Sequence, residues 1–186
     1  MRTASVQDEH PENSSGVPLS SHTKSTGNSA RIVVHQVTTV EQIHQIKDLA
    51  IEFHNESRFS HIPFSEEKYL RAYLGTLDQK NDIAFFITLD GKPVGIIGAK
   101  VGDYFLGEGG RMATTYVVYV SKSVRKTLLG GKIGVRLVRL LVDWCKAQEV
   151  EEIHILATAG IEPEHTDAFL RRLGFEPYGG NYVVGA

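Results

Sequence analysis

An apolar strand, a glycine-rich turn and an amphipathic helix follow one another in the second half of this chain, and no other feature constrains the fold as strongly. Residues 113–120 are nearly all apolar, which predicts a strand buried on both faces of a sheet. The turn at 130–134 has glycine at three of its five positions. Apolar residues then recur at helical spacing as far as Trp144. This order predicts a layered α/β domain in which helices pack on a sheet.

Hydrophobic patterns and turn signals place the other elements along the chain. The expected strands are 32–37, 83–89, 94–101, 113–120, 153–157 and 175–184. The expected helices start at 38, at 65, after the glycine-rich turn and at 165. Thr38 and Glu41 have the spacing of a capping box, which predicts the start of a first helix of about 18 residues. Together these elements predict a mixed central sheet flanked by helices.

The first 29 residues lack the side chains that build a core. They contain ten Ser or Thr residues and no Phe, Trp or Tyr. A segment of this composition cannot bury enough apolar area to offset the entropy it would lose on ordering. We therefore expect residues 1–30 to form a disordered tail, either a solvated extension or an arm that binds a protein partner. Residues 31–186 are expected to form the one folded domain.

Charge and cysteine content disfavour several functional classes. The formal net charge is -2, so the chain lacks the surplus of cations that nucleic-acid binding needs. Nucleic-acid binding is therefore the weakest alternative. The residues that would bind nucleic acid are Arg125, Lys126, Lys132, Arg136 and Arg139. Cys145 is the one cysteine, which excludes an intrachain disulfide and favours a reducing, cytoplasmic location. No apolar run is long enough to span a membrane. A homodimer remains open.

The element order and three local patterns resemble the GCN5-related N-acetyltransferase (GNAT) family. Residues 89–95 (LDGKPVG) are similar to a hairpin of that family, and residues 169–175 (FLRRLGF) to the end of its last helix. Residues 118–120 (VYV), followed by Gly-Lys-Ile-Gly, resemble its acyl-CoA-binding segment. Glu56-Ser57 and Pro63-Phe64 are similar to a bacterial or bacteriophage subgroup. The resemblance covers residues 31–186 and implies a GNAT-like layered domain that uses acetyl-CoA as acyl donor.

The glycine-rich turn is suited to bind such a donor, because coenzyme A carries a pyrophosphate. A helix N-terminus offers unpaired amides and partial positive charge, and glycines allow close approach of the backbone. We expect the amides of residues 130–135 to contact the phosphates, and the strand at 118–120 to pair with the pantetheine amides. The expected donor-binding residues are Val118, Tyr119, Val120, Arg125, Lys126, Gly130, Gly131, Lys132, Ile133, Gly134 and Val135.

The family's reaction is direct attack of an amine on the thioester, and the resemblance places two of its usual catalytic groups at residues that cannot act. Leu170 stands where the family often has a tyrosine acid, and Thr114 where it often has a glutamate base. Candidate substitutes are Glu56 and His61 as bases in or beside the first loop, and Tyr182 as a displaced acid. For Glu56 and His61 the competing interpretation is a solvated loop residue. Arg58 and Phe59 are expected to help shape the acceptor site.

The resemblance implies an enzyme that transfers an acetyl group from acetyl-CoA to a primary amine of a small molecule or protein. The histidines show no metal-ligand spacing, so no metal is expected. The missing tyrosine and glutamate favour an alternative, a catalytically impaired protein of the same fold that acts as an interaction or structural component.

Overall fold

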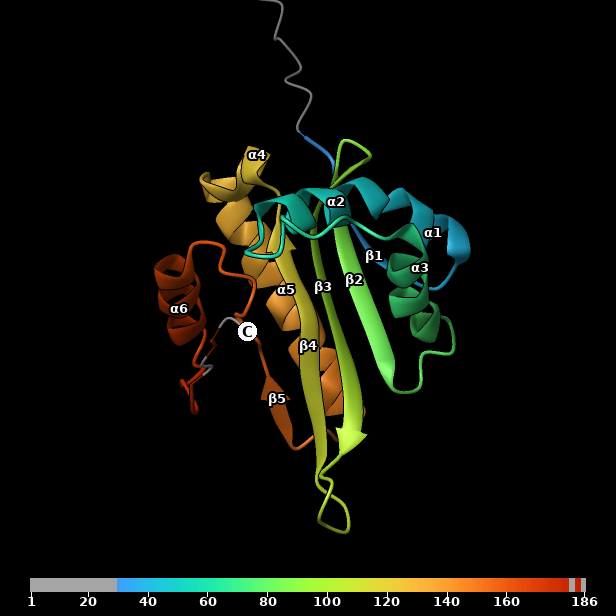
Figure 1. The fold of residues 1–186 in the computed structure, drawn as a ribbon, viewed down its shortest axis with the longest axis vertical. Helices are drawn as coiled ribbons and strands as arrows, with labels where there is room; N and C mark the ends of the chain where they lie inside the picture. Colours follow the sequence, from blue (N-terminus) through green and yellow to red (C-terminus); the bar gives the residue numbers. More distant parts are fainter. Residues whose placement is uncertain (1–29, 181–182, 185–186) are drawn as a thin grey trace, which may run out of the picture.

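The computed structural model describes residues 30–180 and 183–184, and a central sheet divides this part of the chain into two layers (Figure 1). The strands are β1 (Ile32–Gln36), β2 (Asp82–Leu89), β3 (Lys92–Asp103), β4 (Arg111–Val120) and β5 (Glu152–His154). They lie in this order across the sheet. All neighbours are antiparallel except β4 and β5, which are parallel. The prediction of a mixed sheet is therefore confirmed.

Helices cover both faces of the sheet. They are α1 (Val40–Gln45), α2 (Lys47–Glu56), α3 (Glu66–Leu74), the 3-10 helix η1 (Gly75–Leu77), α4 (Lys122–Arg125), α5 (Leu128–Ala147) and α6 (Pro163–Arg172). One core lies between the sheet and α5, where Ile97 packs with Leu137 and Leu141. A second core lies under α1 to α3, where Phe86 and Ile43 are fully buried. Each helical layer thus buries one apolar face of the sheet.

The first predicted helix is two helices, and its capping box is one residue later than expected. The Thr39 side chain accepts from the amide of Gln42, and the Gln42 side chain accepts from the amide of Thr39. Thr38 and Glu41 were therefore the wrong pair. Ile46 separates α1 from α2 and is fully buried. The one-residue shift and the break place the apolar residues of both helices on the core.

A bulge in β4 explains why the prediction for residues 113–120 was only partly right. Gly98 pairs with Val117 and Ala99 with Thr115, so Tyr116 is an extra residue in β4. The bulge reverses the alternation of side chains, because Ala113 faces the α5 core whereas Val117 faces the α1–α3 core. The alternate residues of β4 are only half-buried, so the strand is not enclosed on both faces.

The glycine-rich segment 130–134 is not a turn. It lies in the first turns of α5, whose N-cap is Thr127. The turn that joins β4 to this helix is the short α4 and the residues after it. Glycine has a low helix propensity, so the sequence favoured a turn where packing has imposed a helix.

The C-terminal part holds less strand than predicted. β5 ends at His154, and no strand occurs at 175–180 or 183–184, the described residues of the predicted last strand. Gly174 follows α6 with φ 89°, the left-handed conformation that glycine commonly adopts just after a helix. Residues 1–29 of the predicted tail, and Tyr182, lie outside the described residues. None of the described helices is both long enough and apolar enough to cross a membrane.

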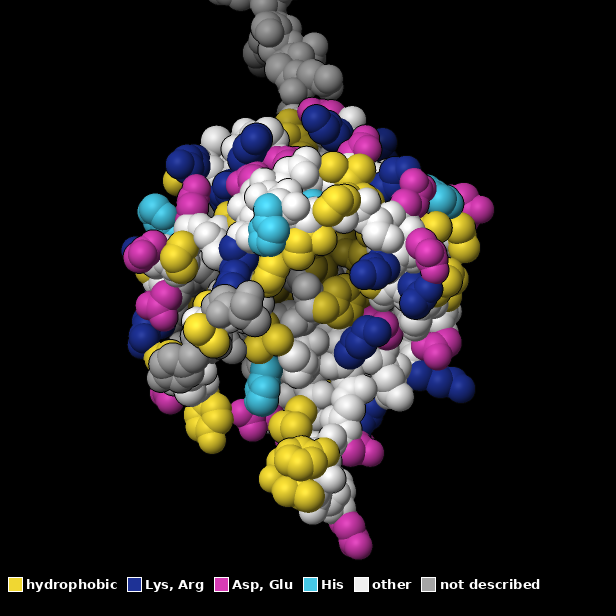
Figure 2. Space-filling view, viewed as in Figure 1, with side chains coloured by type: hydrophobic (Ala, Val, Ile, Leu, Met, Phe, Trp, Pro, Cys, Tyr) yellow, Lys and Arg dark blue, Asp and Glu magenta, His cyan; other side chains and the backbone are white. Residues whose placement is uncertain are grey.

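The β3–β4 hairpin projects beyond the body of the domain (Figures 1 and 2). Its tip carries Phe105 and Leu106, which are 83% and 75% exposed. The opposite end of β4 leads into α4 and α5, so the hairpin tip and the start of α5 lie at opposite ends of the sheet.

Candidate donor-binding cleft

β4 and β5 diverge after a short paired region, and the divergence opens a cavity. Their pairing runs only from Met112 opposite Glu152 to Thr114 opposite His154. The amide of Leu156, two residues beyond the end of β5, donates to Oγ1 of Thr115 at 2.9 Å and not to the β4 backbone. Beyond this point a cavity of about 540 Å³ lies between β4, the segment 155–162, the start of α5 and one face of α6.

Most of the predicted donor-binding residues line this cavity. They are Val118, Tyr119, Val120, Arg125, Lys126, Gly130, Gly131 and Gly134. Lys132 and Val135 border a separate depression on the outer face of α5, which shares only Gly131 with the cavity. Ile133 is buried in the core against the sheet. The structure therefore brings together eight of the eleven residues and leaves three aside.

The three glycines of α5 have different structural roles. A Cβ on Gly130 would lie 2.1 Å from the carbonyl oxygen of Val124, so this glycine permits the close contact of α4 with α5. A Cβ on Gly134 would lie 3.2 Å from the ring of Phe169, where α6 packs. A Cβ on Gly131 would meet no atom within 4 Å. Of the three, Gly131 alone has open space beside it, within the cavity.

The amides predicted to bind phosphate are already engaged. Gly130 donates to Oγ1 of Thr127 at 3.1 Å, and Gly131 donates to the carbonyl oxygen of Thr127. From Lys132 onward the amides bond within the helix, as in any α-helix that begins at Leu128. The amides of residues 128 and 129 come before the first of these donors, so they have no carbonyl acceptor within the helix. They lie at the positive end of the helix dipole. The helix end thus favours an anion, through different amides from those expected.

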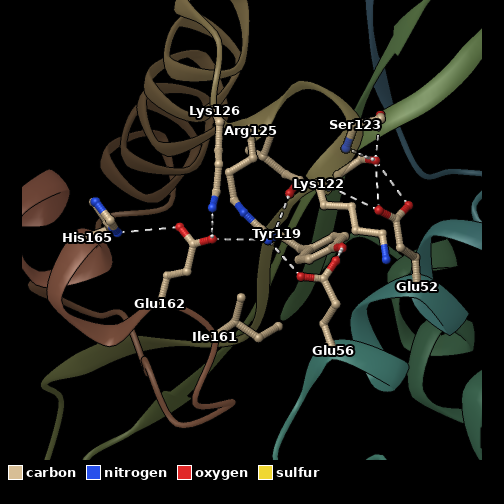
Figure 3. Close-up of polar contacts among 12 residues, drawn as sticks. Glu52, Glu56, Tyr119, Lys122, Ser123, Arg125, Lys126, Ile161, Glu162 and His165 are labelled. Carbon is tan, nitrogen blue, oxygen red and sulfur yellow. Dashed lines mark hydrogen bonds and ion pairs between the residues drawn. The ribbon is translucent and has the colours of Figure 1, made fainter.

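A charged cluster stands where α2, β4 and α4 meet (Figure 3). Nη2 of Arg125 donates to Oε2 of Glu56 at 2.7 Å, and the Tyr119 hydroxyl donates to the other carboxylate oxygen. Burial acts to raise the pKa of Glu56, but the hydrogen bonds from Tyr119 and Arg125 outweigh it and lower the pKa. Nη1 of Arg125 donates to the carbonyl oxygen of Val120 at 3.3 Å. Nε of Arg125 is buried and has no partner among the described residues.

Glu162 approaches the same cations from the opposite wall of the cavity. Its Oε1 lies 3.6 Å from Nη2 of Arg125 and 3.4 Å from Nζ of Lys126. Its Oε2 lies 3.5 Å from Nδ1 of His165 (Figure 3). Glu162 is the N-cap residue of α6, but its side chain makes no capping bond, and its φ of 42° is in the left-handed region.

The three catalytic candidates are not gathered in the cavity. Glu56 lies at its edge, bound to two residues that line it. His61 is exposed on the loop after α2 and is not part of the cavity wall. Tyr182 is outside the described residues. Leu170, where the family resemblance suggests a tyrosine, lines the cavity with an aliphatic side chain.

Sequence reasoning missed one wall of the cavity. Segment 155–162 lines it, together with Phe53 of α2 and one face of α6. The amide of Arg58 donates to the carbonyl oxygen of Ala159 at 2.8 Å, which joins the predicted acceptor loop to this wall. The only available sequence signal was the position of the segment directly after a strand. Among the described residues, no group of three or more potential ligands could hold a metal ion.

Comparisons with known proteins agree with this geometry. The model of the acetyltransferase (GNAT) family matches residues 43–175. The aminoglycoside N-acetyltransferase AAC(6')-Iy in complex with CoA superposes with a TM-score of 0.65 at 15% identity, over 86% of this chain and 97% of that one. Glucosamine-6-phosphate N-acetyltransferase from Arabidopsis thaliana gives 0.60 at 14% identity, over 83% and 98%.

A transcriptional regulator from Bacillus halodurans C-125 gives a TM-score of 0.65 at 17% identity, over 84% of this chain and 100% of that one. At such identities the likeness concerns the fold alone. A comparison with curated protein sequences finds no match. The family model covers well over half of the sequence, and the chain therefore belongs to the acetyltransferase (GNAT) family.

Proposed function

We propose that this protein is an N-acetyltransferase that moves an acetyl group from acetyl-CoA to a primary amine by direct attack. The observation that carries the proposal is the cavity at the divergence of β4 and β5, with the start of α5 at its edge. It combines a mostly apolar cavity, a stretch of β4 backbone that pairs with no strand on this side among the described residues, and cations beside a helix N-terminus. A pantetheine thioester with a diphosphate needs these three features.

Each part of the donor has a candidate partner in the cavity. Arg125, Lys126 and the start of α5 suit the diphosphate, because they combine two cations with the positive end of a helix dipole. After Thr115 the β5 side of β4 has no paired strand among the described residues, and its backbone can bond to pantetheine amides as an added strand would. The open space beside Gly131 allows the ligand to approach the helix.

The reaction needs few groups beyond those that hold the reactants. The amine nitrogen forms a bond to the thioester carbonyl carbon, the carbon–sulfur bond breaks, and the proton released by nitrogen balances the thiolate that leaves. Placing two reactants together can lower the barrier by about 7–11 kcal/mol in favourable cases. Positioning is the main contribution that we assign to this cleft, because Leu170 cannot act as an acid.

Glu56 is better suited to positioning than to proton removal. Its carboxylate already accepts from Arg125 and Tyr119, and its pKa is lowered, which makes it a weaker base. We assign it the role of fixing Arg125 at the edge of the cleft. His61 could serve as a base only if the exposed loop after α2 moved toward the cavity.

Amine acceptors on small molecules have support from the solved neighbours. Two of them are named for the acetylation of an aminoglycoside and of glucosamine 6-phosphate. A catalytically impaired relative is the second candidate, favoured by the aliphatic Leu170 in the cavity wall and by Thr114 within the paired part of β4.

Turnover distinguishes these candidates. The protein is incubated with acetyl-CoA and a panel of amines that includes aminoglycosides, amino sugars, polyamines and lysine peptides, and the released thiol is followed. Amine-dependent thiol release, with the acetylated product seen by mass spectrometry, supports the enzyme. Acetyl-CoA binding without turnover on any amine would favour the impaired relative.

A further inference from the structure

The cationic end of the cleft already contains a protein carboxylate. One oxygen of Glu162 faces both Arg125, at 3.6 Å, and Lys126, at 3.4 Å. Glu56 holds the other side of Arg125 at 2.7 Å. Two cations thus stand against two carboxylates, and the local charge is balanced before any ligand enters.

The two carboxylates are held in different ways. Glu56 is bound at short range by Arg125 and Tyr119, and its side chain is only 18% exposed. Glu162 makes only contacts of 3.4 Å or more in this cluster, at the start of α6 (Figure 3). Of the two, Glu162 is the weaker partner of Arg125 and the one that can be displaced.

The N-terminus of α6 offers a second position for the carboxylate of Glu162. It occupies the N-cap position of α6, yet its side chain makes no capping bond there. Its second oxygen already faces His165 at 3.5 Å, in the first turn of the same helix. A carboxylate released from the cations is therefore stabilised by the α6 N-terminus, where unpaired amides and the dipole favour an anion.

We propose that Glu162 is an exchangeable counter-ion of the donor site, which a diphosphate must displace from Arg125 and Lys126 in order to bind. The proposal rests on the proposed function, because it takes the donor to be acetyl-CoA. Glu162 thereby lowers the affinity for the donor and keeps the cationic site neutral when no donor is present. A permanent structural ion pair would have the opposite consequence, since its loss would disturb the site and weaken binding.

The test is calorimetric titration of acetyl-CoA into the wild type, Glu162→Gln and Glu162→Gly. Glutamine keeps the shape of the side chain without its charge, and glycine suits the left-handed φ of this position. Both variants should bind acetyl-CoA about three- to tenfold more tightly than the wild type at low salt. The gain should shrink as salt is added, because the difference is one of charge.

Glu164→Gln is the matched control. It removes the same charge from an exposed position of the first turn of α6, and its affinity should stay within about twofold of the wild type. Unchanged or weaker binding by both Glu162 variants would overturn the inference and leave the proposed function standing. A gain that does not depend on salt would also overturn it. If neither the wild type nor any variant bound acetyl-CoA, the proposed function itself would fail.

Discussion

Arg125 donates a hydrogen bond of 2.7 Å from Nη2 to Oε2 of Glu56, and this bond joins the last turn of α2 to the segment between β4 and α5. Both side chains are largely buried, at 21% and 18% exposure. The bond therefore contributes to stability and also fixes a cation at the edge of the cleft.

Glu56→Gln should lower the free energy of unfolding by about 2 kcal/mol at pH 7, because a charged hydrogen bond in a partly buried site is lost. Urea denaturation measures this change. Glu67→Gln is the control, since its ion pair with Arg71 is exposed and contributes about 0.5 kcal/mol or less. Equal losses in the two variants would contradict the importance of the Glu56 bond.

The bond between Arg125 and Glu56 predicts that the free energy of unfolding depends on pH. The pKa of Glu56 lies below its ordinary value of 4.5 in the folded chain, so the unfolded chain binds the proton first as pH falls. The stabilisation is complete above pH 4.5 and disappears as pH falls through the folded pKa. The stability difference between wild type and Glu56→Gln should therefore be constant near neutral pH and shrink below about pH 4.5. A difference that grew on acidification would contradict this assignment.

Gly130→Ala and Gly131→Ala should change stability in opposite directions. The added Cβ at 130 would meet the backbone of Val124 at 2.1 Å, which cannot be relieved by a rotamer change, and about 2 kcal/mol or more should be lost. At 131 the Cβ meets nothing within 4 Å, and alanine favours the helix by about 0.5–1 kcal/mol. Thermal unfolding of the two variants measures both effects. A loss at both positions would show that the start of α5 is packed differently.

Cys145 should be inert in the folded protein. It is fully buried against the sheet, and burial raises the pKa of its thiol to about 11. Alkylation by iodoacetamide at pH 8 should therefore be much slower in the native protein than in urea, as followed by intact-mass spectrometry. Rapid labelling of the native protein would contradict the packing of α5 on the sheet.

The sequence predicted the order of most elements because their signals are local. Asp90 and Gly91 both adopt positive φ in the β2–β3 turn, as is typical of an Asp-Gly dipeptide in a two-residue hairpin loop. Leu137 and Leu141 lie on the buried face of α5, as their spacing indicated. The three short patterns that resembled the GNAT family, at 89–95, 118–134 and 169–175, all fall within residues 43–175, which the model of that family matches.

Long-range contacts account for what the sequence did not predict. The bulge at Tyr116 depends on Gly98 of the neighbouring strand, where a Cβ would lie 2.5 Å from the tyrosine ring. The helical state of residues 130–134 depends on packing against Val124 and Phe169. Glu162 reaches Arg125 only because segment 155–162 forms the opposite wall of the cavity. No local pattern encodes these contacts between distant residues.

The central claim is that acetyl-CoA binds at the start of α5, and titration calorimetry on Gly131→Asp and Gly102→Asp tests it most directly. Both glycines are exposed and have no atom within 4 Å of an added Cβ, but Gly102 lies at the far end of β3. We predict a Kd near the micromolar range for the wild type, about -8 kcal/mol, and a similar value for Gly102→Asp. Gly131→Asp should bind at least about tenfold more weakly, because its carboxylate repels the diphosphate. Equal affinity in the two folded variants would contradict the claim.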